Sequence, residues 1–366
     1  MDALSPTVAI DLDALAANFD AVKAAAPAAE CGAVVKCNAY GLGAAQVGKK
    51  LADAGCKTFF VTYAQEGVAL RKALGSGREA VIYVFNGPNE ESLPAFRDFR
   101  LKPVLNGAEQ ARLWAGRSHE AAALHVDTGM NRLGAAQSEI AAIAAIDGLK
   151  IDLFMSHLAC ASDPAHPMND RQRQAFVAAA SNFPKARLSL SASGGAFLAR
   201  EFHFDLVRAG IALYGASPFD RPHPRLKPVA RLTAPVVQLR EVNAGETVGY
   251  GATRAFSAPA KLATVALGYG DGFLRAAGNR GAAWLGGALC PIVGRVSMDL
   301  MVLDASGARE AVKIGDRAEF FGPNLAIEDA AATAGTIAYE LLTDLGPRIA
   351  RRYLSCEREL RGPERA

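Results

Sequence analysis

The sequence predicts an α/β protein with an N-terminal (β/α)8 barrel followed by a smaller, mostly-β C-terminal domain. Up to Arg208, eight short apolar β-type runs alternate with amphipathic helical segments. After that point, strand-like runs punctuated by glycines replace the alternation. Alternating strands and helices indicate parallel βα units, and eight units favour a closed barrel over an open sheet. We expect the domains to span residues 1–228 and 229–366.

The barrel prediction depends on eight expected strands. They are Val34–Lys36, Thr58–Thr62, Ala80–Phe85, Lys102–Leu105, Ala123–Val126, Ile151–Ser156, Arg187–Ser191 and Asp205–Arg208. Helical segments such as Gln65–Leu74 and Ala108–Ala115 lie between them. A leading segment, Val8–Asp11, comes before a helix whose apolar residues recur at helical spacing. We expect this leader to serve core packing.

Four prolines between residues 216 and 230 predict a linker. The strand-like runs beyond it are Val236–Val242, Leu262–Leu267, Cys290–Val293, Met298–Leu303 and Ala318–Phe321. One helical stretch, Ile327–Leu342, interrupts them.

The composition narrows the possible classes of protein. The chain has 366 residues, 40 basic and 37 acidic, with a net charge of +3 and no block of like charge. Nothing in it is typical of a nucleic-acid or membrane binder, and no run is long and apolar enough to span a bilayer. The N-terminus does not have the pattern of a secretory signal. The six cysteines show no CxxC spacing and no metal-site pattern, so we expect reduced thiols in a cytoplasmic enzyme.

Lys36 is an unusual residue to find at the end of a barrel strand. Lysine is rarely buried, because desolvating an ammonium group is costly. At the C-terminal end of a barrel strand, where active sites lie, a lysine can lose its proton and attack a carbonyl. This placement favours a Schiff base with pyridoxal phosphate (PLP). The alternative is a lysine that extends its side chain to solvent.

Other polar residues follow the later barrel strands. They are Arg132, His157, Ser193 and Arg208, the last followed by Gly210-Ile211. In a barrel these loops meet at one mouth, where Ser193 and the amides near Gly210 could bind a phosphate. The alternatives are an ordinary turn at Ser193, a structural histidine and surface ion pairs for the two arginines.

The β domain adds two glycine-flanked blocks, Gly268–Gly272 and Gly294–Asp299. Tyr269 lies between two glycines at a strand end, and a tyrosine with a lowered pKa can act as an acid or base. The alternative is a turn tyrosine that packs against the barrel.

Together these motifs resemble the bacterial alanine racemases, PLP enzymes of fold type III. The stretch from Val34 to Gly43 is similar to the cofactor-lysine signature of that family. Four further blocks match the family in order: Asp127–Gly134, Arg208–Gly215, Gly268–Gly272 and Gly294–Asp299. The resemblance runs across nearly the whole chain.

The resemblance implies a role for each residue of the site. The two bases are Lys36, which also carries the cofactor, and Tyr269. The cofactor-binding residues are Lys36, Tyr40, His157, Ser193, Arg208, Gly210 and Ile211, with Arg208 at the ring nitrogen and beside His157. The substrate-binding residues are Arg132, Met298 and Asp299. No metal is implied.

The resemblance also implies the reaction and the assembly. Two-base proton transfer would interconvert L-alanine and D-alanine in the cytoplasm and supply D-alanine for peptidoglycan. Tyr269 would come from the partner in a homodimer with shared active sites. The alternatives are a racemase of another small amino acid such as serine, a PLP-dependent decarboxylase of this fold, and a non-catalytic PLP carrier. Arg208 argues against the decarboxylase, and Tyr269 with Asp299 argues against the carrier.

Three positions depart from the family pattern. His125 stands where many relatives carry a carbamylated lysine, and a neutral imidazole there could accept a hydrogen bond from Arg132. The stretch Thr343–Arg348 lacks the phosphate-binding tyrosine of many relatives. Ala192 replaces an asparagine common before the phosphate serine.

Overall fold

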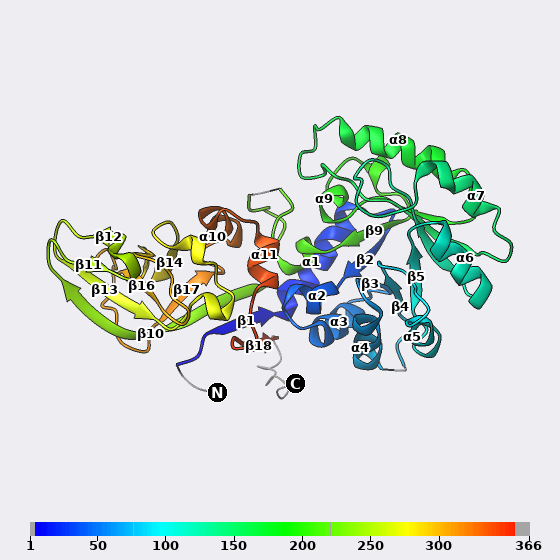
Figure 1. Ribbon diagram of the computed structural model, residues 1–366. Helices are drawn as coiled ribbons and strands as arrows, with labels where there is room; N and C mark the ends of the chain where they lie inside the picture. The colour runs from blue at the N-terminus through cyan, green and yellow to red at the C-terminus, as the bar shows by residue number, and fades with distance from the viewer. Residues whose placement is uncertain (1–3, 76, 220, 356–366) are drawn as a thin grey trace. The chain divides into compact units, whose positions relative to one another are not determined.

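Eight parallel strands in sequence order form the core of the barrel, in a computed structural model that describes residues 4–75, 77–219 and 221–355 (Figure 1). They are β2 (Glu30–Val34), β3 (Thr58–Val61), β4 (Val81–Val84), β5 (Lys102–Leu105), β6 (Ala122–His125), β7 (Ile151–Met155), β8 (Arg187–Ser189) and β9 (Leu206–Ala209). The order of strands is β8-β7-β6-β5-β4-β3-β2-β9, and a parallel bridge between Ala192 and Arg208 links the two ends. The predicted barrel is confirmed.

The first barrel strand ends earlier than the sequence indicated. We expected Val34–Lys36, but β2 ends at Val34, so Lys36 lies beyond the strand. The ladder with β9 pairs Gly32 with Arg208 and Ala33 with Ala209. The apolar run extends past the ladder because Val35 is buried without being part of the strand.

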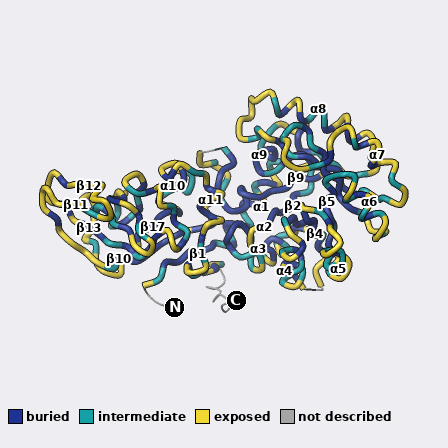
Figure 2. The backbone as a smooth tube through the Cα atoms, in the orientation of Figure 1, coloured by how far each residue is buried: buried dark blue, intermediate teal, exposed yellow. Residues whose placement is uncertain are grey.

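Helices occupy the connections between the barrel strands. They include α3 (Ala44–Asp53), α4 (Ala64–Leu74), α5 (Leu93–Asp98), α6 (Ala108–Arg117), α7 (Ile140–Ala144) and α8 (Met168–Ala180), while α1 (Leu12–Ala25) precedes the first barrel strand. In α4 the buried residues Ala64, Gly67, Leu70 and Leu74 recur at helical spacing, which gives the helix one apolar face. Every residue of β3 and β6 is buried, as expected for strands covered on both sides. The barrel strands β2, β4 and β9 are likewise mostly buried (Figure 2).

A second eight-stranded sheet organises the rest of the chain. Its strands are β1 (Thr7–Asp11), β10 (Ala230–Val242), β13 (Ala260–Val265), β14 (Ala282–Leu285), β15 (Ala288–Pro291), β16 (Met301–Asp304), β17 (Arg317–Phe321) and β18 (Ala350–Leu354). A separate small sheet pairs β11 (Thr247–Val248) with β12 (Arg254–Ala255). The mostly-β character of this region is confirmed.

The leader segment belongs to this second sheet. β1 pairs antiparallel with β10 and parallel with β18, which comes near the end of the described chain. The compact units are therefore Leu15–Leu213, here called the barrel unit, and the described residues of 1–14 and 214–366, here called the β unit. They differ from the expected domains 1–228 and 229–366 in residues 214–228 and in the leader, whose strand partner is so distant in sequence that it leaves no local pattern.

The expected helix Ile327–Leu342 is wrong as a single element. The structure has two helices there, α10 (Ile327–Ala334) and α11 (Ala338–Thr343). Gly335 ends α10 with a φ of 72°, a left-handed conformation that glycine adopts at little cost. In the part of the chain that the structure describes, no helix has the length and apolar character needed to cross a membrane.

Candidate active site

Lys36 opens a left-handed turn at the end of β2. Residues 37–40 all have φ between 51° and 54°, although none of them is glycine. Such conformations cost ~1 kcal/mol or more per residue, so the surrounding structure must hold them. The Lys36 side chain is half-buried, and its Nζ lies 5.9 Å from the centre of the Phe85 ring at the end of β4. The turn thus aims a lysine across the ends of neighbouring strands.

Glu66 holds this turn in place. Its Oε1 accepts the N–H of Cys37 at 2.6 Å, while Oε2 accepts those of Thr62 at 2.8 Å and Tyr63 at 3.2 Å. One carboxylate therefore ties the strained segment to the loop between β3 and α4. We did not predict this role. The only signal was a glutamate three residues into a helix, which by itself indicates a cap.

Ser193, Gly210 and Tyr40 adjoin one another, as the sequence predicted. Ser193 Oγ accepts the N–H groups of Gly210 at 2.9 Å and Ala212 at 3.2 Å. A hydroxyl that accepts two bonds still has its own proton to donate. A Cβ added at Gly210 would lie 2.6 Å from Tyr40 Oη, so only glycine fits there. These residues lie together and, with the adjoining Ile211, are here called the cradle.

Arg208 lies on β9 and is 2 % exposed. Its Nη1 donates to the carbonyl and the hydroxyl of Ser189 at 2.9 and 2.6 Å, and its Nη2 donates to the carbonyl of Ser156 at 2.6 Å and to His157 Nδ1 at 3.2 Å. Burial lowers the pKa of Arg208 to about 9, so it remains charged at neutral pH. Within the described ranges, Nε has no acceptor, which leaves one donor for a ligand.

His157 is a neutral neighbour of Arg208. Arginine can only donate, so His157 Nδ1 is the acceptor and Nε2 carries the proton. Burial and the charge of Arg208 lower the pKa of His157 well below 6.5. The predicted contact between these two residues is present in the structure.

His125 has a partner that the sequence did not indicate. Its Nδ1 lies 3.0 Å from Asn106 Oδ1. Asn106 Nδ2 donates to the carbonyls of Phe85 and Val104, so its Oδ1 must be the acceptor. His125 therefore carries its proton on Nδ1 and keeps Nε2 as an acceptor. Burial, followed by the charge of Arg208, lowers its pKa to about 4.

Arg132 lies exposed in the loop after β6. Asp127 Oδ1 accepts the N–H groups of Gly129 and Met130 at 2.8 and 2.9 Å and so orders this loop. The charge of Arg132 contributes to the lowered pKa of both His125 and His157. The barrel unit thus joins the buried Arg208 to a neutral His157, and the charges of Arg208 and Arg132 both oppose protonation of the two histidines.

The other predicted site residues belong to the β unit. Tyr269 begins the 3₁₀ turn η5 (Tyr269–Asp271) and is 42 % exposed. Its N–H donates to the Ser297 carbonyl at 3.0 Å, and the Gly270 N–H donates to the Met298 carbonyl at 2.8 Å. Met298 and Asp299 are exposed and lie before β16, whereas we expected Met298 inside the strand. The backbone thus brings the two glycine-flanked blocks together.

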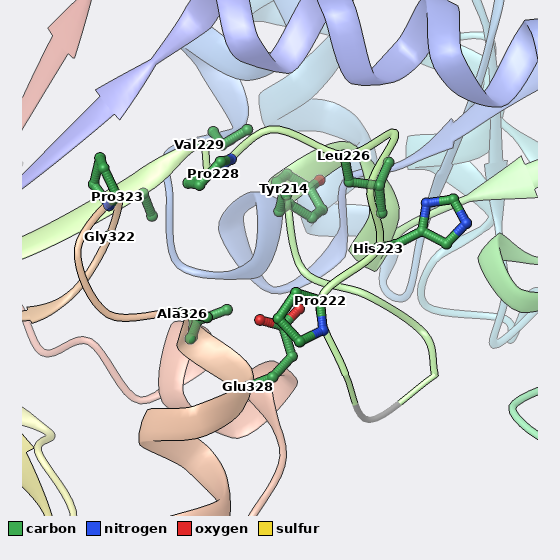
Figure 3. Close-up of a pocket in the computed structure, with 13 residues that line it drawn as sticks. Tyr214, Pro222, His223, Leu226, Pro228, Val229, Gly322, Pro323, Ala326 and Glu328 are labelled. Atoms are coloured by element: carbon green, nitrogen blue, oxygen red, sulfur yellow. The ribbon is translucent and has the colours of Figure 1, made fainter.

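A cavity of about 120 Å³ in the β unit contains none of these residues. Figure 3 shows Glu328 extending from α10 toward the segment that carries Pro222. Glu328 Oε1 accepts the Ser217 N–H at 2.6 Å, which gives this carboxylate a structural role. No group of three or more His, Cys, Asp or Glu side chains in the described chain is arranged to hold a metal ion.

Two family models match the chain. The alanine racemase N-terminal domain matches residues 10–218 and the C-terminal domain matches residues 229–353. The chain belongs to the alanine racemase family. Among curated members, it is 44% identical to a catabolic alanine racemase of Mesorhizobium japonicum, covering 94% of this chain and 92% of that one. It is 45% identical to an alanine racemase of Cereibacter sphaeroides, covering 95% and 97%.

Solved structures of alanine racemases have the same fold. The Bartonella henselae alanine racemase, which holds covalently bound pyridoxal phosphate, superposes with a TM-score of 0.90 at 35% identity over 96% of this chain and 99% of that one. The biosynthetic alanine racemase of Pseudomonas aeruginosa gives 0.88 at 34% identity over the same shares.

Proposed function

We propose that this protein interconverts L-alanine and D-alanine with pyridoxal 5'-phosphate as its cofactor, and that it supplies D-alanine for peptidoglycan. The observation that carries the proposal is the grouping of Lys36, the cradle and the buried Arg208 at the C-terminal ends of neighbouring barrel strands. Active sites of barrel enzymes lie at that face. Membership in the alanine racemase family supports the same reaction.

The residues present fit a phosphorylated pyridine. Gly210 has no room for a side chain, and Ser193 has a hydroxyl proton to donate, so the cradle suits a phosphate group. We assign Tyr40, Ser193, Gly210 and Ile211 to the phosphate. The neutral His157 holds Arg208 from one side and leaves its Nε for the pyridine nitrogen. Arg208 is a donor and keeps its proton, so it disfavours protonation of that nitrogen.

Racemisation requires removal of a proton from Cα on one face and its return on the other. Bound pyridoxal phosphate supplies the electron sink that makes the Cα–H of an amino acid acidic. We assign the two bases to Lys36 and Tyr269. Arg132 and the Met298 amide would hold the carboxylate of alanine, with Asp299 beside them. His125, which keeps Nε2 as an acceptor, supports Arg132 in place of the carbamylated lysine.

We propose that the working enzyme is a homodimer in which Tyr269, Met298 and Asp299 complete the barrel site of the partner. The apolar side chains of Tyr269, Met298 and Leu300 are exposed on neighbouring segments of the β unit. Exposed apolar side chains gathered in one place are typical of a surface that another protein covers. The five described cysteines are free, which agrees with a cytoplasmic enzyme, and Cys356 lies outside the described residues.

The alternatives fit less well. A PLP-dependent decarboxylase benefits from an acid at the ring nitrogen, whereas we assign that position to Arg208. A non-catalytic carrier has no use for a second base. A racemase of serine keeps every assignment above and differs only in the side chain accepted.

A panel assay tests the proposal. The purified chain, loaded with pyridoxal phosphate, is incubated with single L- and D-amino acids, and the products are separated by chiral chromatography. We expect alanine to be racemised from both sides and faster than serine. Faster racemisation of another amino acid, or release of CO₂ in place of inversion, would contradict the proposal.

A further inference from the structure

Arg348 joins two loops of the β unit. It follows α11, which is labelled in Figure 1. Its Nε lies 2.9 Å from Asp271 Oδ1, and its Nη1 lies 2.8 Å from Asp299 Oδ1. The guanidinium group therefore connects the turn that carries Tyr269 to the segment that carries Asp299.

Asp271 is the link between Arg348 and Tyr269. It closes the same 3₁₀ turn, and its side chain is 1% exposed. Its Oδ2 accepts the Gly268 N–H at 2.9 Å, so the carboxylate spans the turn from end to end. Its carbonyl accepts the Gly346 N–H at 2.8 Å, two residues before Arg348. Holding Asp271 therefore fixes the backbone of Tyr269.

Arg348 also lies directly against this turn. A Cβ added at Gly270 would come 3.1 Å from Arg348 Nη1, so the arginine packs on the residue after Tyr269. The Gly270 N–H bonds to the Met298 carbonyl, which belongs to the second loop. Backbone and side-chain contacts thus hold the turn that carries Tyr269 firmly against the loop that carries Met298 and Asp299.

We propose that Arg348 is a positioning residue that sets Tyr269 for proton transfer by clamping Asp271 and Asp299 together. The proposal rests on the function proposed above and adds a residue to it. The Arg348–Asp299 pair is exposed on both sides and stabilises the fold only weakly, whereas the buried Asp271 carboxylate loses its ionic partner when Arg348 is removed. A control that also leaves a buried carboxylate without its arginine is therefore needed to isolate the geometric effect. A misplacement of ~1 Å in a catalytic group lowers the rate by about 100-fold.

The chain offers a matched control for this clamp. Arg231 Nε lies 2.7 Å from Glu319 Oε2, with exposures of 51% for the arginine and 1% for the glutamate. The values for Arg348 and Asp271 are 50% and 1%. Arg231 lies on β10 of the same unit but has no ion pair with the loops of Tyr269 or Asp299 in the described chain. Its loss removes an ion pair of the same kind and leaves the proposed clamp intact.

The experiment compares the loaded wild-type enzyme with R348M, R348K and R231M. We expect R348M to lower kcat for racemisation by about 100-fold, with a smaller change in KM. R348K should recover part of the loss, because an ammonium group can keep one carboxylate but not the forked contact to both. R231M should stay within about 2-fold of the wild type.

Two further measurements distinguish a misplaced Tyr269 from a general loss of structure. In D₂O, Lys36 should still exchange the Cα proton of the enantiomer that faces it, so R348M should raise the ratio of exchange to inversion. In the cofactor-free chain, the amides of Tyr269 and Gly270 should exchange faster in R348M than in R231M. Equal losses of exchange and inversion, or equal effects of R348M and R231M, would overturn the proposal.

These measurements distinguish a failure of the proposed function from a failure of the proposed clamp. A wild-type chain that does not racemise alanine would refute the proposed function, and the amide exchange would then decide on the clamp alone. If R348M does not fold, R348K is compared with R231M by the same measurements of kcat, Cα exchange and amide exchange.

Discussion

Arg208 and Tyr269 are held in opposite ways by their two units. Arg208 is 2 % exposed and donates to carbonyls, a hydroxyl and a histidine of its own barrel unit. Tyr269 is 42 % exposed, and in the described chain its contacts to the other site segment are made by the backbone. The barrel unit thus fixes Arg208 through its own carbonyls and side chains. The β unit presents side chains at its surface.

This difference explains why the barrel residues are easier to interpret. A buried arginine held by neutral acceptors needs an anionic or accepting ligand, and the cradle beside it suggests which one. Tyr269 is an exposed side chain on a firmly held turn, and the β unit alone does not indicate a function for it. Its function depends on what covers it, which we propose is the barrel mouth of a partner.

The largest expected effect concerns Lys36. Lys36→Ala would remove both roles that we propose for this residue, the base and the covalent attachment of the cofactor, so we expect racemisation to fall by ~10⁴-fold or more. Borohydride reduction followed by peptide mass mapping should place the pyridoxyl group on Lys36 in the wild type and on no residue in the variant. Lys49→Ala, an exposed lysine on α3, serves as the control and should change neither result. Labelling of another lysine in the wild type would break the assignment.

Glu66→Gln tests whether the barrel site depends on its strained turn. Glutamine has one carbonyl oxygen, so it can serve either Cys37 or the pair Thr62 and Tyr63, but not both. The lost charge-assisted bond is worth about 1.5–3 kcal/mol, which corresponds to roughly 10- to 100-fold weaker retention of the cofactor. Absorbance of the bound cofactor after dialysis measures this loss.

The control for this variant is Glu246→Gln. Glu246 Oε2 accepts the Asn243 N–H in the β unit, so the same kind of bond is lost away from Lys36. It should retain the cofactor as the wild type does. Equal retention by both variants would show that the turn holds Lys36 without Glu66.

The smallest effect appears only in acid and concerns His125. Its pKa of about 4 in the folded protein lies below the ordinary 6.5, because burial and then Arg208 oppose its charge, while Asp127 acts the other way. The unfolded chain therefore binds the proton first. Stability is complete above pH 6.5 and is lost as the pH falls toward 4, by up to ~3 kcal/mol from this residue.

Urea unfolding between pH 7.5 and 4.5 checks this prediction. His125→Asn keeps a donor near Asn106 and removes the titration, so its stability should fall less steeply with acid than that of the wild type. Part of the dependence of the unfolding free energy on pH will remain in this variant, because the pKa of His157 is also lowered by burial. His119→Asn, at an exposed site, should follow the wild type. An unchanged slope in His125→Asn would contradict the buried neutral state.

Most of the fold was predictable because its signals are local. The alternation of apolar runs and helical segments predicted all eight barrel strands, with boundaries shifted by a few residues. The pairing of β1 with β18 was not predictable, because it joins opposite ends of the chain through backbone bonds. The break at Gly335 was missed because the apolar spacing continues through it.

The site shows the same division. The residues to which we assign chemistry, such as Lys36 and Arg208, came from motifs and from the resemblance. Residues that hold them, such as Glu66, Asn106 and Arg348, were missed because their partners lie far along the chain. A charged side chain in isolation looks like solvated surface, and only the folded structure shows what it binds.

The central claim is that one site combines the barrel of one chain with the Tyr269 turn of another. Mixing Lys36→Ala with Tyr269→Phe, each inactive alone, tests it most directly. After subunit exchange, half of the dimers are hybrids, and each hybrid has one site with both bases intact. We therefore predict recovery of about one quarter of the wild-type activity. No recovery, with exchange verified by tagged subunits, would contradict the shared site.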